Sequence, residues 1–320
     1  MLMEIMHDGL GRAMRLPILV ARGARPGPVF GLTAVVHGNE LNGVPVIHRL
    51  FERIDPHQLR GTLVGVVVVN LPGYLNHRRY FDQVDLNHQF PGREDGSSAQ
   101  VYAHRLVDRV LRHFDYVVDM HTASFGHENS LYIRADMKNE MARRMALLQR
   151  PQIILDDPPS DRTLRGYADE LGIPAITVEI GNPHRFQAEY IRRSLAGLRA
   201  VLAEVRMVPR RKPIEVPKAI TCSSSQWLYT DHGGLLEVFP SVTHMVEEGE
   251  VIARLTNIFG DVLREYRAPT GGVIIGKSVD PVAETGARIV HLGRVIQLPD
   301  EAHEQNPYDS LVDGPAAEGQ

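Results

Sequence analysis

Val35-Val36-His37-Gly38-Asn39-Glu40 is the most informative segment of this 320-residue chain. It closes the apolar, β-branched run at residues 29–36, which is typical of a strand buried on both faces of a sheet. The glycine and asparagine within it disfavour a helix and favour a tight loop, so His37 and Glu40 can converge on one point. A histidine and a carboxylate at the C-terminal end of a strand are two potential ligands for a metal ion.

Two later apolar runs end in the same way. Residues 115–120 lead into His121, and residues 173–178 lead into Glu179. Because the carboxyl ends of parallel strands meet at one edge of a sheet, we expect both side chains to lie beside the first histidine and glutamate. Such ligands, with one position left open, are typical of catalytic zinc, so the sequence predicts a hydrolytic zinc site at this edge.

Strand-like and helix-like segments alternate over the first two thirds of the chain. Buried-strand runs occupy residues 29–36, 62–69, 115–120 and 173–178, and amphipathic helical periods occupy residues 99–113, 138–148 and 187–205. This alternation predicts an α/β fold with a mixed, mostly parallel sheet and helices on both faces. We assign residues 1–208 to this zinc-dependent catalytic domain.

The pattern changes near residue 208. Residues 209–215 contain two prolines around a basic triplet, which is typical of a linker. Residues 216–298 contain short apolar alternations separated by glycines, which predict a C-terminal all-β domain with a barrel or sandwich-hybrid architecture. Residues 299–320 form an acidic tail with few apolar residues, and we expect it to be disordered or loosely docked.

Composition excludes several classes of function. The formal net charge of −4 gives no electrostatic basis for binding nucleic acid. Cys222 is the only cysteine, so neither an intrachain disulfide nor a thiolate zinc site is available. The charged N-terminal residues do not resemble a signal peptide, and no run approaches the ~18 apolar residues of a membrane span. We expect a soluble, cytoplasmic protein that does not associate with membranes.

Four motifs follow one another between residues 37 and 181. They are His37-Gly38-Asn39-Glu40, Asp85-Leu86-Asn87 followed by Phe90-Pro91-Gly92, Asp119-Met120-His121-Thr122, and Gly172-Ile173-Pro174-Ala175-Ile176-Thr177-Val178-Glu179-Ile180-Gly181. In order and spacing they resemble the succinylglutamate desuccinylase/aspartoacylase family, which is related to the zinc carboxypeptidases. The resemblance spans roughly residues 30–185 and implies a zinc carboxypeptidase-like catalytic fold with one Zn²⁺ per chain.

The resemblance implies a separate role for each residue of this site. His37, Glu40 and His121 are expected to be the zinc ligands and to leave one position open for water. Glu179 is expected to be the general base, which takes a proton from the zinc-bound water and passes it to the departing amine.

The same resemblance suggests the residues that support the reaction and hold the substrate. Arg79 is expected to polarise the scissile carbonyl and stabilise the oxyanion, with the neighbouring Arg78 as the alternative. Asp85 is expected to orient a ligand histidine and to fix its tautomer. Asn87 and Arg165 match family residues that bind substrate.

One position departs from the family pattern. The family motif reads Asp-Leu-Asn-Arg, and this chain has His88 where that arginine would bind a carboxylate of the substrate. A histidine offers at most one directed bond there and is mostly neutral at pH 7. Either Arg165 or Arg78 replaces the missing cation, or the substrate differs from the acidic N-acyl amino acids of the name-giving enzymes.

Three classes of function remain open. The first is a zinc amidohydrolase that cleaves the amide bond of a small N-acyl amino acid or an N-acetylated diamino acid. The second is a zinc carboxypeptidase acting on short peptides, which the missing clamp at His88 disfavours. The third is a non-catalytic binding or adaptor protein, which the intact set of predicted ligands disfavours. The sequence does not determine the acyl group or the oligomeric state, and a homo-oligomer is compatible with it.

Overall fold

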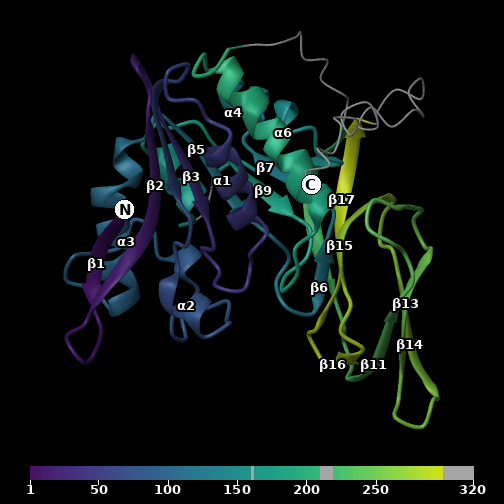
Figure 1. The fold of residues 1–320 in the computed structure, drawn as a ribbon. Helices are drawn as coiled ribbons and strands as arrows, with labels where there is room; N and C mark the ends of the chain where they lie inside the picture. Colours follow the sequence, from purple (N-terminus) through teal and green to yellow (C-terminus); the bar gives the residue numbers. More distant parts are fainter. Residues whose placement is uncertain (160–161, 210–218, 298–320) are drawn as a thin grey trace, which may run out of the picture.

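The computed structural model describes residues 1–159, 162–209 and 219–297 (Figure 1). All but the first residue of the predicted linker at 209–215, and all of the predicted acidic tail at 299–320, lie outside the described residues. The described chain is a mixed α/β fold, with one large mixed sheet, helices packed against it and a smaller second sheet.

The large sheet is parallel at its centre. Its hydrogen-bonded order is β1 (Leu2–His7), β2 (Ala13–Arg22), β4 (Arg60–Val66), β3 (Arg25–Ala34), β5 (Tyr116–His121), β9 (Ala175–Ile180), β7 (Leu131–Ala135), β8 (Ile153–Asp156), β10 (Ile220–Tyr229), β17 (Arg288–Gln297), β15 (Gly272–Ser278) and β12 (Met245–Val246), with β6 (His127–Asn129) paired to β15. β4, β3, β5 and β9 are parallel neighbours, and β2 and β7 flank this group in antiparallel pairs. The predicted mixed sheet is therefore confirmed, and the strands that lead to the predicted site residues are parallel neighbours. The sheet as a whole is not mostly parallel, because its N-terminal strands and the strands after β10 pair antiparallel.

Helices cover both faces of the large sheet, as the alternation of segments predicts. α1 (Gly43–Glu52), α4 (Glu140–Leu148) and α6 (Ala188–Glu204) share one apolar core with the sheet, and α3 (Ser98–Arg109) and α5 (Leu164–Glu170) share a second. On β3, Phe30, Leu32 and Ala34 face the first core, because every second residue of a strand points to the same side. The described helices also include α2 (Leu71–Leu75) and two 3₁₀ turns (Leu86–His88 and Leu111–His113), and none is long and apolar enough to cross a membrane.

The first C-terminal strand extends the large sheet. β10 pairs in parallel with β8, with Ile220 opposite Ile153, so the outer edge of β8 is covered. An uncovered edge would expose unpaired backbone N–H and C=O groups, which natural sheets avoid. The second sheet has the order β14 (Val262–Arg267), β13 (Val251–Thr256), β11 (Gly234–Val238) and β16 (Val282–Ala283).

The C-terminal strands of the two sheets share an apolar core. Leu236 and Ile252 from the smaller sheet lie in one cluster with Ile274 and Val290 from the larger sheet. Figure 1 shows the smaller sheet standing away from the helical layers. Because β10 continues the sheet of the catalytic region, the independence of the region at 216–298 as a folding unit stays a prediction.

Candidate active site

The three strands that lead to the predicted site residues lie side by side. β3 pairs in parallel with β5, with Ala34 opposite Met120, and β5 pairs in parallel with β9, with His121 opposite Glu179. Just beyond β3, Val35 has a positive φ of 61°, which is a strained conformation for a β-branched residue. This residue redirects the chain immediately before the loop that carries the first two predicted ligands.

That loop is packed tightly against α2. The backbone N–H of Asn70 donates to the carbonyl of Val35 at 2.8 Å, and the N–H of Gly38 donates to the carbonyl of Arg79 at 3.2 Å. A Cβ atom on Gly38 would lie 2.0 Å from the carbonyl carbon of Gly73, which is closer than real contacts allow. Glycine therefore lets the loop approach α2 closely, and this packing fixes where its histidine and glutamate point.

His37, Glu40 and His121 converge on one point. Nδ1 of His37 lies 3.1 Å from Nδ1 of His121, and the two carboxylate oxygens of Glu40 each lie 3.0 Å from one of these nitrogens. All three side chains are buried, with at most 5% of each exposed. Two imidazoles and a carboxylate are a donor set that suits Zn²⁺, and their mutual closeness fits a shared cation.

Each histidine has a carboxylate on its other ring nitrogen. Oδ1 of Asp85 lies 3.1 Å from Nε2 of His37, and Oδ2 of Asp119 lies 2.8 Å from Nε2 of His121. Such a partner keeps the proton on Nε2, so the lone pair of Nδ1 faces the ligand cluster. Asp85 lies where its predicted role requires, whereas sequence reasoning assigned no role to Asp119. Its spacing from His121 is the available signal, because residues i and i+2 of a strand share a face.

Asp119→Asn should weaken metal binding by about 10–100-fold, because an amide no longer favours the required tautomer of His121. The substitution keeps a side-chain oxygen that can accept from the hydroxyl of Thr33, a bond of 2.6 Å, so the fold should remain intact. Competition with a chelator of known affinity measures the change. Asp108→Asn is the control, because Asp108 is exposed on α3. Equal affinities in the two variants would show that Asp119 does not orient the histidine.

The charges around the ligands favour a cation. Burial works to raise the pKa of Glu40, but His37 and His121 hold that pKa well below its usual value. Burial works to lower the pKa of His121, but Asp119 and Glu40 hold it well above its usual value. The carboxylates that favour a protonated imidazole would equally favour a divalent cation between the ligand atoms.

Of the two neighbouring arginines, Arg79 is the one that contacts the ligand cluster. Its guanidinium donates to Oε1 of Glu40 at 3.1 Å and to Oδ2 of Asp85 at 2.9 Å, and it also contacts the hydroxyl of Ser124. Burial works to lower the pKa of Arg79, but the two carboxylates raise it, so the group stays charged. Arg78 is exposed to solvent. Arg79 is therefore placed to face negative charge that develops near the ligands.

Glu179 lies beside the ligand cluster on β9. Its side chain is 12% exposed, and burial raises its pKa above the usual value. Nδ2 of Asn129 donates to Oε2 of Glu179 at 3.3 Å, and Nε of Arg134 lies 4.0 Å from Oε1. Sequence reasoning missed both neighbours. They lie beside Glu179 because of where β6 pairs and because β7 runs antiparallel to β9, and no local pattern in the sequence indicates either pairing.

The remaining predicted residues make contacts outside the ligand cluster. Oδ1 of Asn87 accepts from the backbone N–H of Leu164 at 2.9 Å and so holds the start of α5. Arg165 is 5% exposed and donates twice to Asp157, with both bonds 2.8 Å long. His88 is exposed at the end of a 3₁₀ turn. A substrate contact by any of the three predicted residues stays a prediction.

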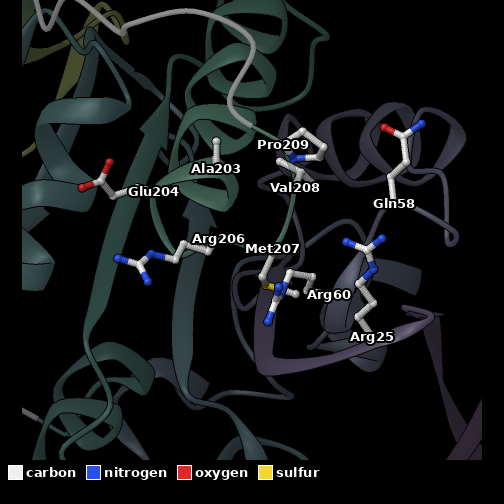
Figure 2. A pocket seen from close by; sticks show the side chains of 9 residues that line it. All are labelled: Arg25, Gln58, Arg60, Ala203, Glu204, Arg206, Met207, Val208 and Pro209. Carbon is white, nitrogen blue, oxygen red and sulfur yellow. The ribbon is translucent and has the colours of Figure 1, made fainter.

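A cavity of about 500 Å³ lies at the opposite ends of the central strands. Figure 2 shows the residues that line it, which are Arg25, Gln58, Arg60, Ala203, Glu204, Arg206, Met207, Val208 and Pro209. β3 and β4 begin at two of these arginines, whereas the predicted site lies at the C-terminal ends of the parallel strands. The cavity is therefore separate from the candidate active site.

Comparison with known proteins identifies the family. The model of the succinylglutamate desuccinylase/aspartoacylase catalytic domain matches residues 26–205, which is more than half of the chain. The chain belongs to this family. The matched region includes every residue of the ligand cluster, its two carboxylate partners and Glu179, and it ends before the C-terminal strands.

Two relatives of the chain have named activities. The N-alpha-acetyl-L-2,4-diaminobutyric acid deacetylase of Halomonas elongata is 22% identical over 299 residues, which cover 89% of this chain and 87% of that protein. The succinylglutamate desuccinylase of Pseudomonas paraeruginosa is 26% identical over 170 residues, which cover 48% of this chain and 51% of that protein. The match to the deacetylase therefore extends over nearly the whole of both chains, and the match to the desuccinylase over about half.

Solved structures of other proteins share the fold. The product-bound ectoine utilization protein EutE (DoeB) of Ruegeria pomeroyi superposes with a TM-score of 0.82 at 20% identity, over 90% of this chain and 92% of that chain. The succinylglutamate desuccinylase/aspartoacylase from Rhodobacter sphaeroides superposes with a TM-score of 0.81 at 21% identity, over 92% of this chain and 94% of that chain. The likeness in fold thus extends past the catalytic region into the C-terminal strands.

Proposed function

We propose that this chain is a zinc-dependent amidohydrolase that removes the acyl group from a small N-acyl amino acid. The convergence of His37, Glu40 and His121 beside Glu179 carries the proposal, because it combines a cluster able to bind zinc with a carboxylate able to accept a proton. Family membership and the nearly full-length match to a diaminobutyric acid deacetylase support an N-acetylated diamino acid as the first substrate to test.

The residues of the site fit the steps of amide hydrolysis. When bound, Zn²⁺ would polarise the amide carbonyl and lower the pKa of water towards about 7. Glu179 would take a proton from the attacking water and deliver it to the nitrogen of the departing amine, while the acyl group leaves as a carboxylic acid. Its raised pKa suits both accepting and releasing that proton. Arg79 would stabilise the negative charge that develops on the carbonyl oxygen.

A panel of substrates tests the proposal. The protein is stripped with a chelator, reloaded with Zn²⁺ and assayed for release of free amine. The panel holds N-acetyl and N-succinyl forms of acidic, basic and neutral amino acids, including N-acetyl-2,4-diaminobutyrate and N-succinylglutamate. We expect hydrolysis of at least one member, loss of that activity in the stripped protein, and recovery on addition of Zn²⁺, since the metal supplies the electrophile.

Short peptides in the same panel separate the alternative functions. Release of C-terminal residues from peptides, with no cleavage of N-acyl amino acids, would support a zinc carboxypeptidase. Tight binding of Zn²⁺ without hydrolysis of either class would contradict the amidohydrolase and favour a binding or adaptor protein.

A further inference from the structure

β6 links the C-terminal strands to the candidate active site. His127 and Asn129 lie two residues apart on β6, so their side chains share one face of that strand. Asn129 donates to Glu179 at 3.3 Å, which places this face next to the candidate base. Burial lowers the pKa of His127, and the charges of Arg288 and Arg79 lower it further. β6 pairs with β15, with Ser278 opposite His127, and β15 pairs with β17, so β6 joins the C-terminal strands to the candidate base.

Trp227, on β10, packs against His127. Their ring centroids lie 5.5 Å apart in an edge-to-face arrangement. The indole also stacks on His291, with centroids 4.8 Å apart and ring planes 8° apart. His291 is 2% exposed, and its Nε2 lies 2.7 Å from the hydroxyl of Ser225. These contacts hold the indole in one orientation, which lowers the entropic cost of using it to support a binding group.

Arg288 provides a cation without a carboxylate partner beside this indole. Its guanidinium carbon lies 4.7 Å from the centre of the Trp227 ring, and its side chain is exposed. Within residues 1–159, 162–209 and 219–297, no carboxylate oxygen lies within 4.0 Å of this guanidinium. Three other arginines near the site are already paired, because Arg79 binds two carboxylates, and Arg134 and Arg165 share a third.

We propose that Arg288, held against Trp227, binds a carboxylate of the N-acyl amino acid and so sets a preference for substrates that carry a free carboxylate. This inference rests on the proposed function and deepens it. A guanidinium is permanently charged and presents a planar pair of donors that matches a carboxylate. Arg288 thereby supplies the cation that the family motif places at His88, and it does so from β17 instead of from the catalytic region.

Two matched substrates test this assignment. Wild-type protein and Arg288→Gln are compared on an N-acyl amino acid that the protein hydrolyses and on its carboxamide, which keeps the shape and removes the charge. The substitution should raise the KM for the acid by about tenfold or more, because a bond between charged groups is lost, and should leave kcat and the KM for the carboxamide nearly unchanged. Arg288→Lys keeps the charge without the planar fork, so its KM for the acid should lie between the values of the wild type and Arg288→Gln.

Two further variants sharpen the comparison. Arg254→Gln is the matched control, because Arg254 also lies over an aromatic ring, that of Phe239, but belongs to the smaller sheet. It should leave the KM for the acid unchanged. Arg78→Gln tests the other exposed arginine, and an increase in KM confined to that variant would assign the carboxylate to Arg78 instead.

The outcomes separate this inference from the proposed function. If the wild type hydrolyses the acid and Arg288→Gln, with unchanged circular dichroism, leaves its KM unaltered, Arg288 does not bind the carboxylate and the amidohydrolase stands. Equal increases in KM for the acid and the carboxamide would likewise overturn the inference, because the effect would not depend on charge. Absence of hydrolysis by the wild type would overturn both.

Discussion

Glu179→Gln should lower kcat by about 10²–10⁴-fold while the protein still binds one zinc ion per chain. Glutamine has nearly the shape of glutamate, and its carbonyl oxygen can still accept from Asn129, but it cannot accept a proton at neutral pH. The loss should appear in kcat more than in KM, because the proton moves on the way to the transition state. Steady-state kinetics on the best substrate of the panel, together with metal analysis of the same sample, measure both quantities.

Glu189→Gln is the matched control for this variant. Glu189 lies in the first turn of α6 with 68% of its side chain exposed, so the same chemical change there should leave turnover and zinc content unaltered. Full activity in Glu179→Gln would show that another group moves the proton. Loss of zinc together with activity would instead make Glu179 a metal ligand.

The sequence could predict that the side chains of His37, Glu40 and His121 lie close together, because this depends on where strands end. An apolar β-branched run is a local pattern, and parallel strands deliver their last residues to one edge of a sheet. The structure accordingly places β5 between β3 and β9, with His121 opposite Glu179. The helices on both faces followed from an equally local pattern, the helical spacing of apolar residues.

Contacts between strands that are distant in the sequence could not be predicted in this way. Arg134 lies near Glu179 because β7 runs antiparallel to β9, and Trp227 and Arg288 come from strands far later in the chain. Arg165 matched a family position, yet its guanidinium is bonded to a nearby aspartate, which no pattern of residues indicated. Side-chain partners of this kind depend on the assembled sheet and not on local spacing.

The C-terminal region shows the same limit at the level of the fold. Short strands separated by glycines indicated an all-β region, and residues 220–297 do form strands and connecting turns. Which edge those strands would cover was not encoded locally, because the open edge of β8 exists only after the catalytic strands have assembled. The pairing of β10 with β8 is what places Trp227 on the same sheet as the candidate active site.

His121→Ala should remove both the bound zinc and the activity. The imidazole supplies one of three ligand atoms, and its Nδ1 lies 3.0 Å from the carboxylate of Glu40, so two remaining donors would hold the metal far more weakly. The change also leaves the carboxylate of Asp119 buried without its imidazole partner, which should cost about 3–5 kcal/mol of stability. Metal analysis after gel filtration, amine release and urea denaturation measure the three effects.

Comparison of this variant with Glu179→Gln separates metal binding from proton transfer. His121→Ala should lose zinc and turnover together, because it removes a metal ligand. Glu179→Gln should lose turnover alone, because it removes only the proton acceptor on the adjacent strand. His113→Ala, at an exposed position that ends a 3₁₀ turn, controls for removal of an imidazole and should retain both properties. Normal zinc content in His121→Ala would contradict its assignment as a ligand. Other residues would then have to hold the metal, and the proposed mechanism would no longer have its electrophile at this cluster.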